Sequence, residues 1–152
     1  MNQKKRDRYC VEILHAITLN STCLTRQVGA LIVNEQAKIY GTGYNGTPIG
    51  IANCNEGGCQ RCADRIAGKV KSGEGLEYCV CCHAEENAIL FATGRLKGKI
   101  MYTQWVPCSS CARKIINVGI KEVVCLKDDY ADKMGGELLR QAGIKIRVIA
   151  GQ

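Results

Sequence analysis

The sequence has no long apolar run, no block of five or more like charges and few aromatic side chains. Among its 152 residues, no stretch approaches the roughly 20 apolar residues that a membrane-spanning helix needs. The net charge is +7, but the basic residues are scattered and aromatic residues make up only 5%. An extended surface for single-stranded nucleic acid is therefore poorly supported. An anionic small substrate fits this charge at least as well.

No signal peptide is evident at the start of the sequence. The basic segment MNQKKRDRY leads into charged and polar helix material and not into an apolar core. We therefore expect a cytoplasmic protein, whose eleven cysteines are better explained by metal binding than by disulfides because thiols stay reduced there. Three of them, Cys10, Cys23 and Cys125, lie in apolar stretches where a free cysteine packs like a small hydrophobe.

Helical and strand-like patterns alternate along most of the chain and predict an α/β fold. Apolar spacing predicts a first helix over residues 7–19, and β-like runs at 28–33 and 38–44 predict a hairpin. The later helices are expected at 83–93, 108–119 and 132–143, and the later strands at 99–105, 121–126 and 144–150. Strands that alternate with short helices indicate a partly parallel sheet covered on both faces. We expect residues 1–152 to form a single domain.

Residues 45–82 show neither pattern and contain mostly glycine, cysteine and charged residues. A structureless segment of that length is unusual in a compact domain unless something orders it. Four thiolates around Zn²⁺ would fasten a segment that has no apolar core of its own. We therefore expect a cysteine-rich insert that is held together by zinc.

Two short motifs carry the strongest functional signal, HAE at 83–85 and PCSSC at 107–111. Together they resemble the H-x-E and P-C-x-x-C signature of zinc-dependent deaminases. Each motif opens a predicted helix, where free N–H groups and partial positive charge favour the thiolate forms of Cys108 and Cys111. With His83 they give zinc three protein ligands and leave the fourth position to a water molecule, whose pKa the metal lowers to about 7.

Glu85 is the expected proton carrier of this scheme. It would take a proton from the water, deliver it to the ring nitrogen of the substrate and later protonate the departing amine. A glutamate in a first helical turn is otherwise often a cap, which is the role we expect for Glu86 and Glu74. A lone C-x-x-C motif can also be a redox pair, but the two motifs together favour catalysis. His15, within the first predicted helix, is expected to be structural.

Longer stretches of the chain resemble one group of the cytidine and deoxycytidylate deaminase family. They are TRQVGALIV, GTGYNGTPIG, HAEENAIL, MYTQWVPCSSCARKIINVGIKEVV and LLRQAGIKI, and they are similar to the deoxycytidylate (dCMP) deaminases over about residues 8–148. The resemblance implies a three-layer α/β/α fold of the cytidine-deaminase type, with a five-stranded mixed sheet. It also implies hydrolysis of dCMP to dUMP and ammonia, which supplies dUMP for thymidylate synthesis.

The same resemblance implies an assembly and its regulators. Members of the group are usually homohexamers, often activated by dCTP and inhibited by dTTP. A regulatory nucleotide, with Mg²⁺ as its companion ion, is expected near the GYNGTPIG loop at a subunit interface.

The resemblance also implies substrate contacts. Asn45 would bind the sugar, and the backbone around Ala84 would bind the edge of the base. Arg26 and Tyr130 are the candidates for the 5′-phosphate, because the fork of an arginine matches phosphate oxygens. For Arg26 a solvated surface position stays open as an alternative, and for Tyr130 packing in the core or at its rim.

The segment YCVCCHAEEN (78–87) would then divide between two metal sites. His83 and Glu85 belong to the catalytic zinc, and YCVCC serves a second, structural zinc with the cysteine-rich insert. The expected ligands of that second zinc are Cys54, Cys59, Cys62 and Cys79, with Cys81 as the first substitute and Cys23 as the second. Cys82 is expected to be a packed thiol.

Two other functions stay open. A deaminase of a different cytosine or adenine substrate, such as dCTP, a nucleoside or tRNA, would share both motifs, although tRNA would need a more continuous basic surface. A zinc-stabilised binding module without catalysis would be expected to lack the glutamate or a metal ligand. Glu85, His83, Cys108 and Cys111 are all present in this sequence.

Overall fold

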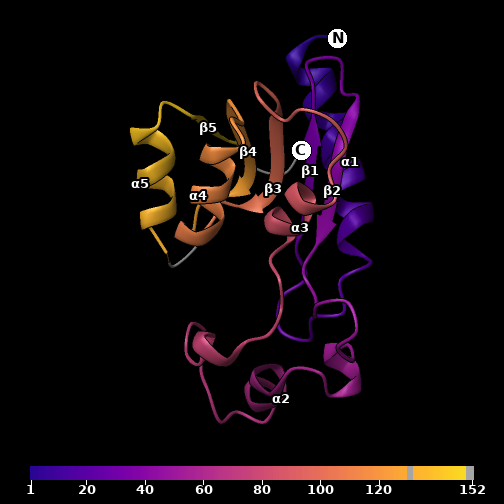
Figure 1. The fold of residues 1–152 in the computed structure, drawn as a ribbon, viewed down its shortest axis with the longest axis vertical. Helices are drawn as coiled ribbons and strands as arrows, with labels where there is room; N and C mark the ends of the chain where they lie inside the picture. The colour runs from indigo at the N-terminus through magenta and orange to yellow at the C-terminus, as the bar shows by residue number, and fades with distance from the viewer. Residues whose placement is uncertain (130–131, 150–152) are drawn as a thin grey trace.

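The computed structural model describes residues 1–129 and 132–149, which form a mixed five-stranded sheet between two helical layers (Figure 1). The strands are β1 (Gly29–Val33), β2 (Ile39–Tyr44), β3 (Ile100–Trp105), β4 (Glu122–Lys127) and β5 (Lys145–Val148). Their order in the sheet is β2-β1-β3-β4-β5. Strand β1 pairs antiparallel with β2 and β3, whereas β3, β4 and β5 run parallel. The predicted α/β/α fold with a mixed sheet is confirmed.

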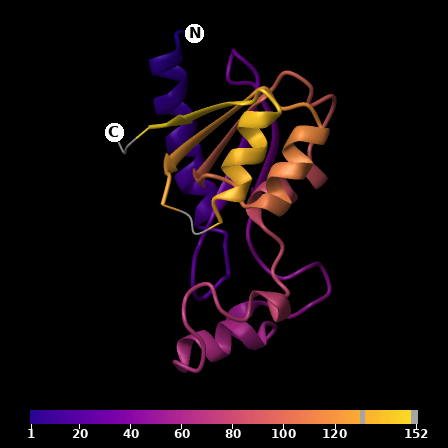
Figure 2. The ribbon, with the colours of Figure 1, turned by 90° about the vertical axis from the view of Figure 1, so that its left-hand side faces the viewer.

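Helices cover both faces of the sheet, as Figures 1 and 2 show. Helix α1 (Gln3–Thr18) packs on one face, where Leu14 contacts the cluster that contains Leu31 and Tyr102. The other face carries α3 (Ala84–Leu90), α4 (Ser109–Asn117) and α5 (Met134–Gln141). Successive strand residues point to opposite faces, so Leu31 faces α1 while its neighbours Ala30 and Ile32 face the three-helix layer.

Each predicted helix and strand of this body is present, with shifted ends. The largest shift is at α1, which begins at Gln3 because the side-chain oxygen of Asn2 accepts a 2.9 Å hydrogen bond from the backbone N–H of Lys5. The first turn of α1 is polar. The spacing of apolar residues, on which the prediction was based, therefore placed the start of this helix too late. Of the described residues, no helix has the length and apolar character needed to cross a membrane.

Residues 47–81 leave the sheet and form a separate lobe, called here the cysteine lobe (Figures 1 and 2). Its two ends are held together by backbone hydrogen bonds between Gly46 and Cys82, 2.8 and 3.3 Å long. Where the sequence predicted no regular structure, the lobe contains α2 (Gln60–Ile66) and two short 3₁₀ turns. Helix α2 has only seven residues, too few to display a helical period.

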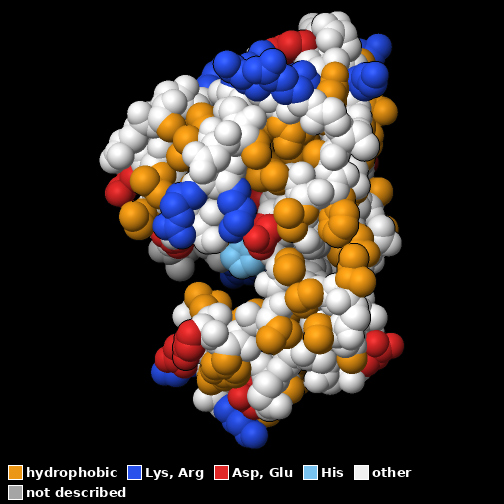
Figure 3. Space-filling model, in the orientation of Figure 1, with side chains coloured by type: hydrophobic (Ala, Val, Ile, Leu, Met, Phe, Trp, Pro, Cys, Tyr) orange, Lys and Arg blue, Asp and Glu red, His pale blue; other side chains and the backbone are white. Residues whose placement is uncertain are grey.

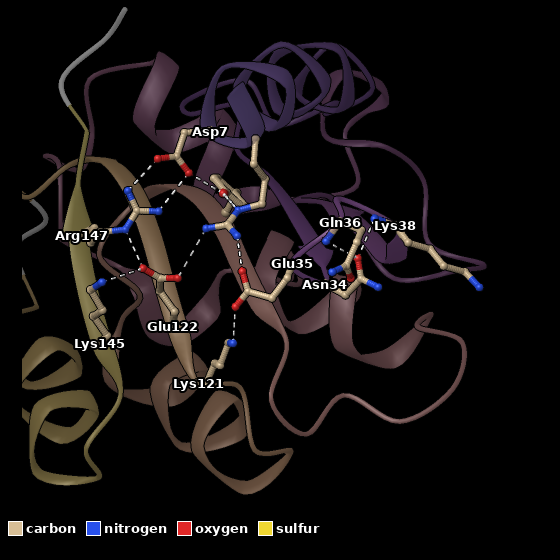
Figure 4. Close-up of polar contacts among 11 residues, drawn as sticks. Asp7, Asn34, Glu35, Gln36, Lys38, Lys121, Glu122, Lys145 and Arg147 are labelled. Carbon is tan, nitrogen blue, oxygen red and sulfur yellow. Dashed lines mark hydrogen bonds and ion pairs between the residues drawn. The ribbon is translucent and has the colours of Figure 1, made fainter. Parts of the chain in front are cut away.

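A network of charged side chains fastens α1 to the sheet (Figure 4). The Tyr102 hydroxyl donates a 2.6 Å hydrogen bond to Asp7, and Arg147 donates two more, of 2.7 and 2.9 Å. Arg147 also donates to Glu122 at 2.6 Å. Burial alone would raise the pKa of Asp7, but the hydrogen bonds from Arg147 and Tyr102 outweigh it and hold the pKa below its ordinary value. The network thus favours charged Asp7 in the folded chain.

The β1–β2 hairpin turns through an asparagine-centred loop, also drawn in Figure 4. The side-chain oxygen of Asn34 accepts hydrogen bonds from the backbone N–H groups of Gln36 and Lys38, at 3.0 and 2.9 Å. Ala37 adopts a left-handed φ of 62°. Short polar side chains that bond to the backbone two or more residues on are typical of such turns.

Candidate active site and metal centres

The predicted catalytic metal ligands meet where α3 and α4 begin. His83 is the N-cap residue of α3, Cys108 is the N-cap residue of α4, and Cys111 lies in the first turn of α4. The Nδ1 atom of His83 lies 3.4 Å from the Sγ atom of each cysteine. Local sequence therefore fixes each ligand at a helix start, and the sheet brings the two helix starts together.

Two close approaches of backbone hold this geometry. A Cβ atom on Gly43 of β2 would lie 2.2 Å from the carbonyl oxygen of Ala84, so only glycine lets α3 rest directly on the strand. A Cβ atom on Gly135 of α5 would lie 1.9 Å from the carbonyl oxygen of Pro107. The start of α5 thus fixes the position of the backbone before Cys108. The sequence motifs did not indicate this contact.

The three ligand atoms fit a zinc ion. With Zn–S near 2.3 Å and Zn–N near 2.1 Å, a tetrahedral ion separates nitrogen from sulfur by about 3.6 Å. The observed separations of 3.4 Å need little adjustment. His83 is exposed and Cys108 is half-buried, so a water molecule or a substrate could reach an ion held here from the surface. Three protein ligands with an open position are typical of a catalytic zinc.

Without a metal ion, one of the three predicted ligands is charged in the form that binds a cation, the thiolate of Cys108. Hydrogen bonds from Cys111 and then from His83 lower the pKa of Cys108 to about 4. The hydrogen bond with the Cys108 thiolate raises the pKa of His83 to about 9. Sharing a proton with Cys108 raises the pKa of Cys111. Without metal the site therefore holds protons that a bound zinc ion would displace.

Glu85 is buried beside these ligands, with 7% of its surface exposed. Its Oε1 atom accepts a 3.0 Å hydrogen bond from the hydroxyl of Thr103 in β3. Its Oε2 atom lies 3.8 Å from the Sγ atom of Cys111. Burial raises the pKa of Glu85. A carboxyl group in this position holds a proton more readily than an exposed one, which suits a proton carrier.

Asn45, the expected sugar contact, organises a loop next to the site. Its side-chain oxygen accepts hydrogen bonds from the Ser21 hydroxyl at 2.6 Å and the Val28 N–H at 2.8 Å. Its side-chain nitrogen donates to the carbonyl oxygen of Arg26 at 2.7 Å. The backbone of its neighbour Gly46 pairs with Cys82, next to the ligand His83, so the loop of residues 21–28 is fixed close to the metal ligands.

Arg26, the expected phosphate contact, lies against an aromatic ring. Its guanidinium carbon is 4.8 Å from the ring centroid of Trp105, a cation–π arrangement. Trp105 is the last residue of β3 and lies three residues before Cys108. Because Arg26 packs on Trp105, its exposed side chain lies at the rim of the site. Tyr130, the other expected phosphate contact, lies outside the described residues.

Thr103, Trp105 and Gly135 were not found by reasoning from the sequence. Strand alternation offered one signal, because it puts Thr103 on the same face of β3 as Met101, toward α3 and α4. Figure 3 shows the surface hollowed between the sheet body and the cysteine lobe, below the region of α3 and α4 in Figure 1.

The cysteines of the lobe lie close enough together to hold metal, with Cys23 among them, but in a different grouping from the predicted one. The four expected ligands Cys54, Cys59, Cys62 and Cys79 do not form one group. The described residues instead form two groups with sulfur atoms within 4.8 Å of one another: Cys23, Cys54, Cys62 and Cys81, and Cys59, Cys79 and Cys81. Cys23 was expected first to pack in an apolar stretch, and the fold brings its loop onto the lobe. Cys82 is half-buried and joins neither group.

Comparisons with known proteins bear directly on these motifs. A family model described as the cytidine and deoxycytidylate deaminase zinc-binding region matches residues 4–127. The deoxycytidylate deaminase of Schizosaccharomyces pombe is 41% identical over 143 residues, which cover 93% of this chain and 43% of that protein. The human deoxycytidylate deaminase is 38% identical over 139 residues, covering 85% and 72%. The chain thus spans less than half the length of the S. pombe relative.

A solved structure gives the same fold. The crystal structure of dCMP deaminase from the cyanophage S-TIM5, in complex with dCMP and dUMP, superposes with a TM-score of 0.74 at 23% identity. The match covers 98% of this chain and 99% of the cyanophage chain. From the family match and the sequence relatives it follows that this chain belongs to the cytidine and deoxycytidylate deaminase family.

Proposed function

We propose that the chain hydrolyses dCMP to dUMP and ammonia at a single zinc ion held by His83, Cys108 and Cys111. The observation that carries this proposal is the buried Glu85 carboxyl beside two thiols and an imidazole whose spacing fits zinc. The sequence relatives named above are deoxycytidylate deaminases, and the cyanophage enzyme of the same fold was solved with dCMP and dUMP. In a cell the product dUMP would feed thymidylate synthesis.

Zinc in this site would lower the pKa of a water molecule to about 7 and so make it nucleophilic at neutral pH. Glu85 would accept the proton that this water gives up and pass it to N3 of the cytosine ring. Once the water oxygen is bonded to C4, Glu85 would take its remaining proton and pass it to the exocyclic nitrogen, which leaves as ammonia while the C4–O bond becomes the carbonyl of dUMP. Thr103 holds Oε1 of Glu85, and Oε2 is left beside Cys111 on the metal side.

Substrate recognition would use the loop that Asn45 holds. The side-chain nitrogen of Asn45 carries two N–H groups, one of which bonds to Arg26, and we assign the other to a sugar hydroxyl. The backbone N–H of Ala84, in the first turn of α3, would meet the edge of the base. The fork of Arg26 would bind the 5′-phosphate while its flat face stays on Trp105. Tyr130 is the proposed second phosphate contact.

The cysteine lobe would be an insert in one domain of residues 1–152 and would bind a structural zinc of its own. Apolar side chains on the outer surface of β2, the following loop and α3 support contact between subunits, as in a homohexamer. They are Tyr44, Ile49, Ile51, Leu90 and Phe91, all exposed. A regulatory dCTP or dTTP, accompanied by Mg²⁺, would bind near the loop of residues 43–50. The free thiols of the lobe fit the reducing cytoplasm.

Ammonia release from dCMP, dCTP, deoxycytidine and tRNA, measured in parallel, tests the proposal. We expect dCMP to be the preferred substrate by kcat/KM. Preference for dCTP, deoxycytidine or tRNA would assign the site to a different deaminase. No release from any of them by zinc-loaded protein would favour a non-catalytic zinc-binding module.

A further inference from the structure

We propose that the cysteine lobe binds two zinc ions rather than one, as a six-thiolate cluster in which the Cys81 sulfur bridges both ions. This inference extends the structural zinc site proposed above. One ion would be held by Cys23, Cys54, Cys62 and Cys81, and the other by Cys59, Cys79 and Cys81.

The geometry that carries the inference is the overlap of the two cysteine groups at Cys81. Cys81 lies 3.1 Å from Cys54 and also interacts with Cys23 and Cys79, which belong to different groups. Cys62 lies 3.8 Å from Cys23 and also interacts with Cys54 and Cys59. The Cys81 sulfur is therefore the member that both groups share, and Cys62 lies toward the second group without belonging to it.

The distances match the edges of two tetrahedra. A zinc ion with Zn–S bonds of about 2.3 Å places its sulfur ligands about 3.8 Å apart. The Cys23–Cys62 separation is 3.8 Å in one group, and the Cys59–Cys79 separation is 4.0 Å in the other. The Cys54–Cys81 separation of 3.1 Å is shorter and would widen when an ion enters.

Burial favours two ions over one, and net charge does not oppose the second ion. Cys54, Cys59 and Cys62 are at most 3% exposed, and in the described structure the buried residues of this core cluster are cysteines alone. A single zinc would bind four thiolates and leave two thiols in this core with no metal. Six thiolates with two Zn²⁺ carry a net charge of about −2, the same as one zinc with four thiolates. The nearly buried guanidinium of Arg61 interacts with Cys79 and balances part of that charge.

Metal analysis of the purified whole chain tests the number of ions. We expect about three zinc ions per chain, one catalytic and two in the lobe, and no iron or acid-labile sulfide. His83→Ala should leave about two, because the lobe ligands are untouched. Cys59→Ser with Cys79→Ser should also leave about two, and the matched control Cys82→Ser, from the same segment but outside both groups, should keep three.

Two zinc ions in the wild type and one in His83→Ala would mean that the lobe holds a single ion, which overturns this inference and leaves the structural zinc in place. An equal zinc content in the wild type and His83→Ala would instead count against the proposed catalytic site. If metal analysis found iron and acid-labile sulfide, the lobe would hold an iron–sulfur cluster, and the inference of two zinc ions would be overturned.

The shared ligand has a test that needs no cysteine variant. In wild-type protein loaded with Co²⁺, a thiolate bridge couples the two lobe ions magnetically, so their EPR signal should be strongly reduced at full loading. Full EPR intensity from every bound Co²⁺ would show that no thiolate is shared between the two lobe ions. The proposed Cys81 bridge would then be wrong, even if the lobe binds two ions.

Discussion

The Thr103 hydroxyl donates a 3.0 Å hydrogen bond to the Oε1 atom of Glu85, linking the centre of the sheet to the group proposed to carry the proton. Both side chains are buried, so water does not replace this bond if it is lost. Thr103 touches no metal ligand among the described contacts and acts only by fixing the carboxyl group. It is therefore a positioning residue.

Thr103→Val should lower kcat for dCMP by roughly ten- to a hundredfold, because a hydrogen bond to a charged group contributes about 1.5–3 kcal/mol. Valine has nearly the same shape, so the zinc content and KM should change little. Thr103→Ser keeps the hydroxyl group and should recover most of the loss. If serine and valine were equally slow, the methyl group and not the hydrogen bond would be the important part of Thr103.

Glu85→Gln should retain the fold and the zinc but lose about 10²–10⁴-fold in kcat, since the amide cannot carry the proton. Steady-state rates and zinc content are measured on the same sample. Glu86→Gln, one residue further along α3, is the control and should stay near the wild-type rate. A fully metallated Glu85→Gln variant with a wild-type kcat would remove Glu85 from the mechanism.

Arg26→Ala should reduce kcat/KM for dCMP by roughly ten- to a hundredfold, because the phosphate loses a charge-assisted partner. The effect on deoxycytidine, which has no phosphate, should be small. Arg26→Lys should recover only part, because a point charge replaces neither the fork nor the flat face on Trp105. The comparison requires one fixed ionic strength, because salt screens exposed phosphate contacts. Equal losses on both substrates would assign Arg26 to the fold instead.

Gly135→Ala should displace the backbone of Pro107 and Cys108, because the added Cβ atom would overlap the Pro107 carbonyl oxygen. We expect a loss of about 1–3 kcal/mol in unfolding free energy and lower zinc occupancy. Gly136→Ala is the matched control, since its Cβ atom would meet only the side chains of Arg140 and Val106, at 3.1 and 3.3 Å. Similar behaviour of the two variants would show that α5 does not set the position of Cys108.

Asp7→Asn should cost about 1.5–3 kcal/mol of stability, because Arg147 and Tyr102 lose a charged hydrogen-bond acceptor, although Arg147 keeps Glu122. The folded-state pKa of Asp7 lies below its unfolded value, so this contribution is complete above the unfolded pKa and disappears as the pH falls through the folded one. The difference in unfolding free energy between wild type and variant should thus be constant above about pH 5 and shrink below about pH 4. Urea titrations across this range measure it, with Glu12→Gln on the exposed side of α1 as control.

The sheet could be predicted from local patterns, and the meeting of His83 with Cys108 and Cys111 from two motifs that together resemble a known signature. Strand alternation identifies residues such as Leu31 and Ile32, and each metal ligand stands at a helix start next to its own motif. The fold class then brings the two helix starts together. No contact between distant segments had to be known in advance.

The grouping of the lobe cysteines could not be predicted in the same way. Cys23 and Cys62 are 39 residues apart, and their 3.8 Å contact depends on how the loop of residues 21–28 descends onto the lobe. The spacing of cysteines in the sequence does not show in which direction this loop runs. The contact of Arg26 with Trp105 has the same origin, because the loop and the end of β3 meet only in the folded chain.

The paired backbone of Gly46 and Cys82 also affects the order in which the chain can fold. Helix α3 rests on β2, yet the whole cysteine lobe lies between them in sequence, so their contact requires closure of a long loop. Loop closure before any compensating contact slows folding. Metal bound early in the lobe would shorten the effective loop, so refolding with zinc present should bring His83 and Glu85 to the sheet sooner than refolding without it.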